Sequence, residues 1–112
     1  MNWPNDADGD VFRSLEAQGF NFDQEVEIDF IIDFNHWPLN ERERKTILSK
    51  LPDIELIDPD DEDRENGIEL GYGLVKRKNF LTYEYVIEVQ DYLTNLIEKD
   101  VGGVCQCWGV FH

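Results

Sequence analysis

The chain has 112 residues, and its 25 Asp and Glu against 10 Lys and Arg give a formal net charge of −15 at pH 7. This length fits one domain spanning residues 1–112, and a hydrophobic content of 41% is enough to form a core. The charge argues against a protein that binds nucleic acid or an anionic membrane, because both present phosphate groups that it would repel.

The N-terminus lacks the basic region and the apolar run of a signal peptide, and no apolar stretch is long enough to span a membrane. Two cysteines one residue apart do not form the disulfide framework of a secreted protein. We therefore expect a cytoplasmic protein.

The first predicted element is a short helix, capped by Asp8 or Gly9 and ended by Gly19, which suits the left-handed position after a helix. Its apolar stripe consists of Val11, Phe12 and Leu15. Phe20 and Phe22 follow in a turn. We expect residues 1–22 to pack on the rest of the domain.

Residues 26–34 alternate more cleanly than any other segment. One face holds Val26, Ile28, Phe30, Ile32 and Phe34, and the other holds Glu27, Asp29, Ile31 and Asp33. This period of two predicts a half-buried strand in the interior of a sheet. Its polar face then presents three carboxylates.

The middle of the chain predicts a helix, a short strand and a loop. After a turn over 35–38, Asn40 and Glu43 form a capping box for a helix that ends at Pro52. The apolar face of this helix consists of Ile47, Leu48 and Leu51. Residues 53–58 predict a short strand with Ile54 and Leu56 inward, and residues 58–67 predict a solvated acidic hairpin loop.

The last third predicts a strand, a long helix and a final strand. The first strand spans 68–74, where Ile68, Leu70, Tyr72 and Leu74 alternate. Thr82 caps the helix, which Gly102-Gly103 ends, and the final strand spans 104–111. The apolar face of the helix consists of Tyr85, Val86, Val89, Leu93, Leu96 and Ile97.

This order of elements predicts an α+β fold of the ferredoxin-like, split βαβ type. Four antiparallel strands form the sheet, two helices cover one of its faces, and the N-terminal helix is an addition.

Several motifs resemble known sites without completing them. Gly71-Tyr72-Gly73-Leu74-Val75 is similar to part of an RNA-binding motif but lacks its basic residue and further aromatics. Asp6-x-Asp8-x-Asp10 begins like a calcium loop but lacks its Gly and its Glu. Cys105-x-Cys107 places both thiols on one strand face, and only His36 and His112 remain to complete a zinc site. We therefore expect no cofactor and no metal, and we expect both cysteines to be packed beneath a helix.

Catalytic motifs are also missing: both serines lie within predicted helices, and the sequence has no phosphate-binding or dinucleotide-binding loop. Seven of the ten basic residues occur in two runs, one in the second predicted helix and one after the third predicted strand. They are Arg42, Arg44, Lys45, Lys50, Lys76, Arg77 and Lys78. Either they form surface salt bridges, or they polarise a surface that orients a protein partner.

The three tryptophans, Trp3, Trp37 and Trp108, lie near the ends of elements, where an exposed ring serves as a binding anchor. We expect at least two of them to pack in the core.

Both ends of the chain resemble the regulator of ribonuclease activity B (RraB) family. The matching residues are Asp8-Gly9-Asp10-Val11, Leu15, Gly19-Phe20 and Val26-Glu27-Ile28-Asp29-Phe30 at the start, and Gly102-Gly103 and Trp108-Gly109 at the end. The resemblance implies a small acidic α+β protein without catalytic residues that binds the endoribonuclease RNase E and restrains RNA decay.

The leading hypothesis is a non-enzymatic regulator that binds and inhibits an RNase E-like enzyme through a basic segment of that enzyme. The candidate partner-binding residues are Glu27, Asp29, Asp33, Trp37, Asp58, Asp60, Asp61, Glu62, Asp63 and Trp108. Two alternatives stay open: a ligand-binding or enzymatic domain with a pocket between sheet and helices, and a toxin-neutralising immunity-type protein.

Overall fold

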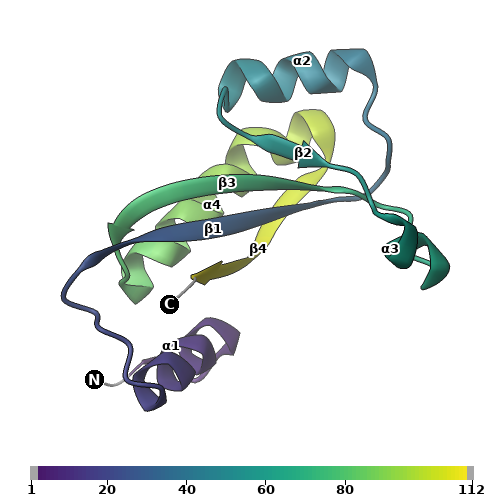
Figure 1. Ribbon diagram of the computed structural model, residues 1–112. Coiled ribbons are helices and arrows are strands. Elements are labelled where there is room, and N and C mark those ends of the chain that lie inside the picture. Colours follow the sequence, from purple (N-terminus) through teal and green to yellow (C-terminus); the bar gives the residue numbers. More distant parts are fainter. Residues whose placement is uncertain (1–2, 111–112) are drawn as a thin grey trace.

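The structure, a computed structural model, describes residues 3–110. In chain order the elements are α1 (Ala7–Ala17), β1 (Glu25–Phe34), α2 (Glu41–Lys50), β2 (Glu55–Ile57), α3 (Asp61–Glu65), β3 (Tyr72–Phe80), α4 (Tyr83–Val101) and β4 (Gly103–Val110). The strands pair antiparallel in the order β2-β3-β1-β4, and α2 and α4 lie together on one side of the sheet (Figure 1). The predicted α+β fold with an extra N-terminal helix is confirmed.

The core lies between the sheet and α4. Strand β1 is an interior strand, and its alternation is confirmed, since Ile28, Phe30 and Ile32 are fully buried. Thr82 caps α4 as expected, by accepting a hydrogen bond from the backbone of Tyr85. The buried residues of α4 are Val86, Gln90, Leu93, Ile97 and Val101. The last predicted strand is confirmed up to Val110, and Phe111 and His112 lie outside the described residues.

Helix α1 begins earlier than expected. Its N-cap is Asp6, not Asp8 or Gly9, because the Asp6 carboxylate accepts a hydrogen bond of 2.7 Å from the backbone of Gly9. The face turned to the core consists of Gly9, Phe12 and Leu15, so Val11 lies at its margin and is 38% exposed. The expected place of Val11 in the stripe was therefore wrong.

Strand β3 begins four residues later than expected. Ile68 and Leu70 precede it and are exposed, and Lys76–Lys78 lie within the strand rather than after it. The cause is long-range pairing: all nine residues of β3 pair with the long strand β1, with Val75 opposite Phe30. This register turns Val75 to the core and places Tyr72 and Leu74 on the other face.

Two smaller elements also differ from expectation. The acidic segment after β2 contains α3, because Asp60 and Asp63 form a reciprocal capping box. In α2 the capping box of Asn40 and Glu43 is confirmed, but Leu48 is 45% exposed and does not belong to the buried face.

A β-bulge in β4 separates the two cysteines. The pairing with β1 passes from Ile31–Cys107 to Ile32–Cys105, which leaves Gln106 without a partner position. Cys105 is therefore buried and Cys107 is exposed on the opposite face. The expectation that both thiols share one face and pack beneath a helix was wrong.

The two thiols are expected to differ in reactivity, because burial raises the pKa of Cys105 to about 12. With an aromatic disulfide reagent near neutral pH, one thiol per chain should react in the native protein and both should react after unfolding. Cys107→Ser should abolish the native reaction and Cys105→Ser should preserve it. Equal native reactivity of the two thiols would contradict the bulged register.

Candidate protein-binding surface

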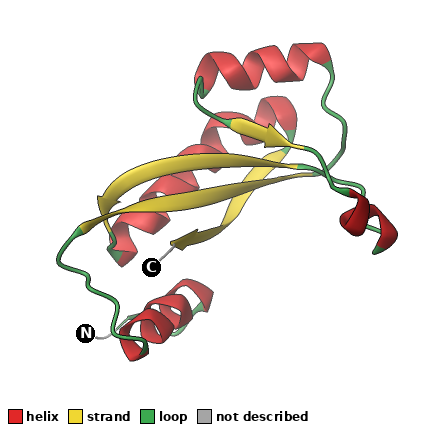
Figure 2. Cartoon of the chain, in the orientation of Figure 1, coloured by secondary structure: helices red, strands yellow, loops and turns green. Residues whose placement is uncertain are grey.

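The sheet has an open face, turned away from α2 and α4 (Figure 2). Strand pairing arranges its side chains in rows across the strands. From the α3 end, the first row is Ile57, Tyr72, Asp33 and Val104, and the second is Glu55, Leu74, Ile31 and Cys107. The third is Lys76, Asp29 and Gly109, the fourth is Lys78 and Glu27, and the last is Phe80 and Glu25. The open face is thus largely apolar near α3 and charged at its other end.

The three carboxylates that the sequence predicts on the polar face of β1, Glu27, Asp29 and Asp33, are not equivalent. Glu27 and Asp29 lie opposite Lys78 and Lys76, and the ammonium of Lys76 is 3.6 Å from the carboxylate of Glu27. Asp33 lies opposite Tyr72 and Val104, so no basic residue faces it across the strands. Of the three acids expected to form one polar face, Glu27 is paired with a lysine, and Asp33 has no basic residue opposite it. Asp29 lies opposite Lys76 in the register, but its Oδ1 is buried and has no hydrogen-bond partner among the described residues.

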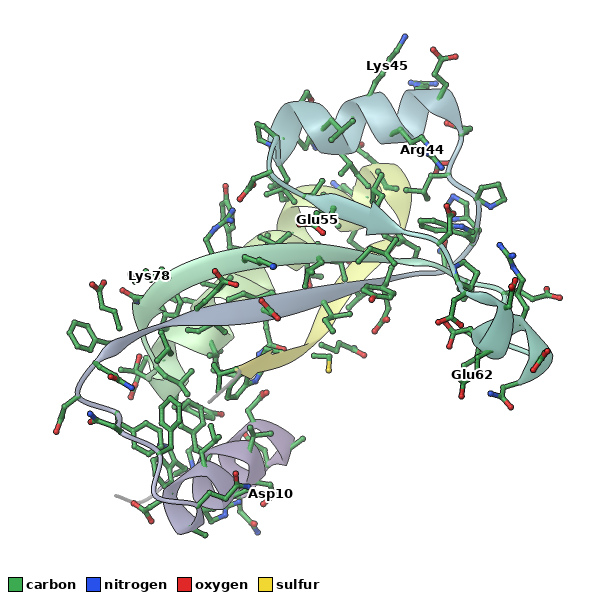
Figure 3. All side chains as sticks on the ribbon, viewed as in Figure 1. Asp10, Arg44, Lys45, Glu55, Glu62 and Lys78 are labelled. Atoms are coloured by element: carbon green, nitrogen blue, oxygen red, sulfur yellow. The ribbon has the colours of Figure 1, made fainter. Side chains whose placement is uncertain are left out.

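The strongest concentration of negative charge lies in the connection between β2 and β3. Residues 58–69 carry seven Asp and Glu and a single basic residue, Arg64. Strand β1 ends where β3 begins, so this connection leaves the sheet beside Asp33. We call Asp33 together with the acids of residues 58–69 the acidic end. Figure 3 shows Glu62 on α3 at this end and Lys78 far from it along β3.

Trp37 holds the acidic end in place rather than projecting from it. Its indole Nε1 donates a hydrogen bond of 2.9 Å to the Asp58 carboxylate, and its ring packs 5.8 Å from the ring of Phe34. A Cβ added to Gly71 would lie 2.4 Å from the Trp37 ring, so glycine is needed for β3 to begin here. Trp37 thus joins the segments that follow β1 and β2 to the start of β3.

Trp108 belongs to the core. It is 7% exposed, its ring lies 5.2 Å from Phe12, and its Nε1 donates a hydrogen bond of 2.7 Å to Asp8. Trp3 and Trp37 are half-buried and packed against the same core, which confirms that at least two tryptophans pack inward. Because α1 covers its ring, Trp108 offers a partner little surface, and its predicted role as a binding anchor stays a prediction.

Most residues of the two basic runs form ion pairs. Lys50 lies 2.6 Å from Asp100 and lowers the pKa of that carboxyl through a hydrogen bond, and Arg77 lies 2.6 Å from Asp53. Lys45 pairs with Glu41 one turn away in α2. These contacts favour the salt-bridge interpretation of the basic runs over a polarised surface that orients a protein partner.

Other kinds of site find little support in residues 3–110. No three His, Cys, Asp or Glu side chains in this range are placed to hold a metal ion, and His112 lies outside it. None of the helices in the same range is long and apolar enough to cross a membrane.

These features define a small α+β protein with an antiparallel sheet that is open on one face. Its most distinctive surface feature is the negative charge of the acidic end. The family model described as RraB, regulator of ribonuclease activity B, matches residues 5–110, and the chain belongs to this family. The resemblance seen at both ends of the sequence is thereby confirmed. A comparison with curated proteins finds no match.

Proposed function

We propose that this protein is a non-enzymatic cytoplasmic regulator that inhibits an RNase E-like endoribonuclease by binding a basic segment of that enzyme. The family supports the general role, since it is a family of regulators of ribonuclease activity. One observation carries the choice of surface. The acidic end combines Asp33 with seven acids of residues 58–69, and Arg64 is the one basic residue in that segment.

Electrostatics provides the mechanism of inhibition. An enzyme that holds RNA does so largely through Lys and Arg contacts to phosphate. The acidic end offers the same basic side chains a set of carboxylates, so the regulator and the RNA compete for one segment. The adjacent apolar rows of the open face, centred on Ile31 and Leu74, supply the area that is buried in the complex.

Preorganisation strengthens this contact. The capping box of Asp60 and Asp63 fixes α3, and the bond from Trp37 to Asp58 fixes the start of the same connection. The carboxylates are held near their binding positions before the partner arrives, which lowers the entropy lost on binding.

The proposal predicts a steep dependence on salt. Between roughly 50 mM and roughly 200 mM KCl, the affinity for the basic segment of the ribonuclease should fall on the order of 100-fold, since the contact is made by exposed charges. Fluorescence anisotropy with the labelled segment measures this directly. RNA added to the complex should displace the protein. Affinity that is insensitive to salt, or simultaneous binding of RNA and protein to the segment, would rule out the mechanism.

A further inference from the structure

A second surface lies at the other end of the molecule, where the N-terminal segment meets α4. It is a groove of about 650 Å³. Its apolar walls include Trp3, Phe22 and Ile87, and its rim carries Glu84, Glu88 and Asp91. Strand β3 runs from the acidic end at Tyr72 to Phe80, just before α4 begins, so the groove and the acidic end are separated by the length of the sheet.

The groove is built from fixed walls. The Trp3 ring stacks on Phe12 at 5.4 Å and lies 5.7 Å from Phe22. The Arg13 guanidinium donates hydrogen bonds of 3.1 Å to the backbone carbonyls of both Trp3 and Pro4. These contacts hold the N-terminal segment as one wall, so an occupant meets a preformed hollow.

Tyr83 ties this wall to α4. Its hydroxyl donates a hydrogen bond of 2.6 Å to Asp6, the N-cap of α1, and this bond raises the pKa of Tyr83 to about 12. The Tyr83 hydroxyl therefore stays protonated at neutral pH and keeps the two helices joined beside the groove.

The rim of the groove is uniformly acidic. Glu84, Glu88 and Asp91 follow one another at spacings of four and three residues, so they lie on one face of α4, with Ile87 between them. All three are exposed, and within residues 3–110 no Lys or Arg forms an ion pair with any of them. An apolar hollow beneath one row of unpaired carboxylates fits an apolar side chain flanked by cations.

We propose that this groove binds a basic amphipathic helix of a protein partner, with one large apolar side chain inserted between Trp3 and Ile87. Lys or Arg residues one turn apart on that helix are spaced about 6 Å, which matches the spacing of Glu84 and Glu88. The proposal is independent of the function proposed above, because the two surfaces share no residue. A second copy of this chain is the weaker candidate, since two molecules of charge −15 repel each other.

Selection of short peptides from a random display library against the full chain tests the groove. Enriched peptides should carry a large apolar residue flanked by Lys or Arg at helical spacing. The triple variant Glu84→Gln, Glu88→Gln, Asp91→Asn should weaken their binding about tenfold or more, and Glu98→Gln, an exposed acid of α4 outside the groove, should leave it unchanged. Changing the apolar residue of the peptide to Ser should weaken binding as strongly.

The proposal would be overturned by enriched peptides without basic residues, by equal binding to the triple variant, or by self-association of the chain that the triple variant abolishes. Asp61→Lys, Glu62→Lys separates it from the proposed function. That variant should keep its affinity for the selected peptides even if it no longer binds the basic ribonuclease segment. If the selected peptides are lost in the same variant, they bind the acidic end and the groove is not their site.

Discussion

Replacing Phe12 by alanine is expected to lower the free energy of unfolding by about 3–5 kcal/mol. Phe12 is fully buried, and its ring lies 5.2 Å from Trp108, 5.4 Å from Trp3 and 6.2 Å from Tyr83. Its ring carries the apolar packing of α1 against Tyr83 of α4 and Trp108 of β4. Truncation leaves a cavity that the surrounding rings fill poorly, because they are held by several other contacts. Urea unfolding followed by circular dichroism and tryptophan fluorescence measures the loss.

The matched control is Val11→Ala, at the neighbouring position of the same helix. Val11 is 38% exposed, so its truncation should change the free energy of unfolding by less than about 1 kcal/mol. Similar losses for the two variants, or a loss below about 1 kcal/mol for Phe12→Ala, would mean that α1 does not dock through this face.

The elements that the sequence predicts well are those decided locally. The alternation over β1 requires only neighbouring residues, and the caps at Asn40 and Thr82 act within one helical turn. The left-handed position after α4 is equally local, and Gly102 occupies it with φ +76°. Local rules also apply to α3, whose capping residues Asp60 and Asp63 are hidden within a run of acids.

The elements that were misplaced depend on distant partners. An apolar alternation put the third strand over 68–74, but pairing with β1 extends it through Lys76 and Lys78, which face Asp29 and Glu27. The bulge at Gln106 has no signal in its own sequence, because it arises from the register between β4 and β1. Cross-strand pairing therefore determines which side chains face the core and which charged residues lie opposite one another on the open face.

The candidate surface could be predicted from the sequence only in part, because strand pairing decides which residues join it. Five of the six residues 58–63 are acids, so their clustering follows from the sequence alone. That Asp33 joins them, while Glu27 pairs with Lys76 and Asp29 lies opposite the same lysine, follows only from the sheet. The groove beside α4 was missed, since its walls come from three separate segments. The spacing of Glu84, Glu88 and Asp91 around Ile87 was the one signal in the sequence.

Charge reversal at the acidic end is expected to have the second large effect. Asp61 and Glu62 are exposed on α3 and lie outside its capping box, so Asp61→Lys, Glu62→Lys should leave the fold intact. Each reversal replaces an attraction to a basic partner by a repulsion. At low ionic strength the affinity for the basic ribonuclease segment should fall on the order of 100-fold.

The matched control is Asp23→Lys, Glu25→Lys, which makes the same change in net charge. Both acids are exposed, and they lie just before β1 and at its start, at the end of the sheet away from α3. This pair of variants separates a contact at the acidic end from a general effect of the net charge.

The most direct test of the account is the dissociation constant of the basic ribonuclease segment, measured by calorimetry at low salt for the native chain and both double variants. We predict a loss on the order of 100-fold for Asp61→Lys, Glu62→Lys and less than about threefold for Asp23→Lys, Glu25→Lys. Equal losses for the two variants, or no loss for the first, would contradict the claim that the acidic end binds the ribonuclease.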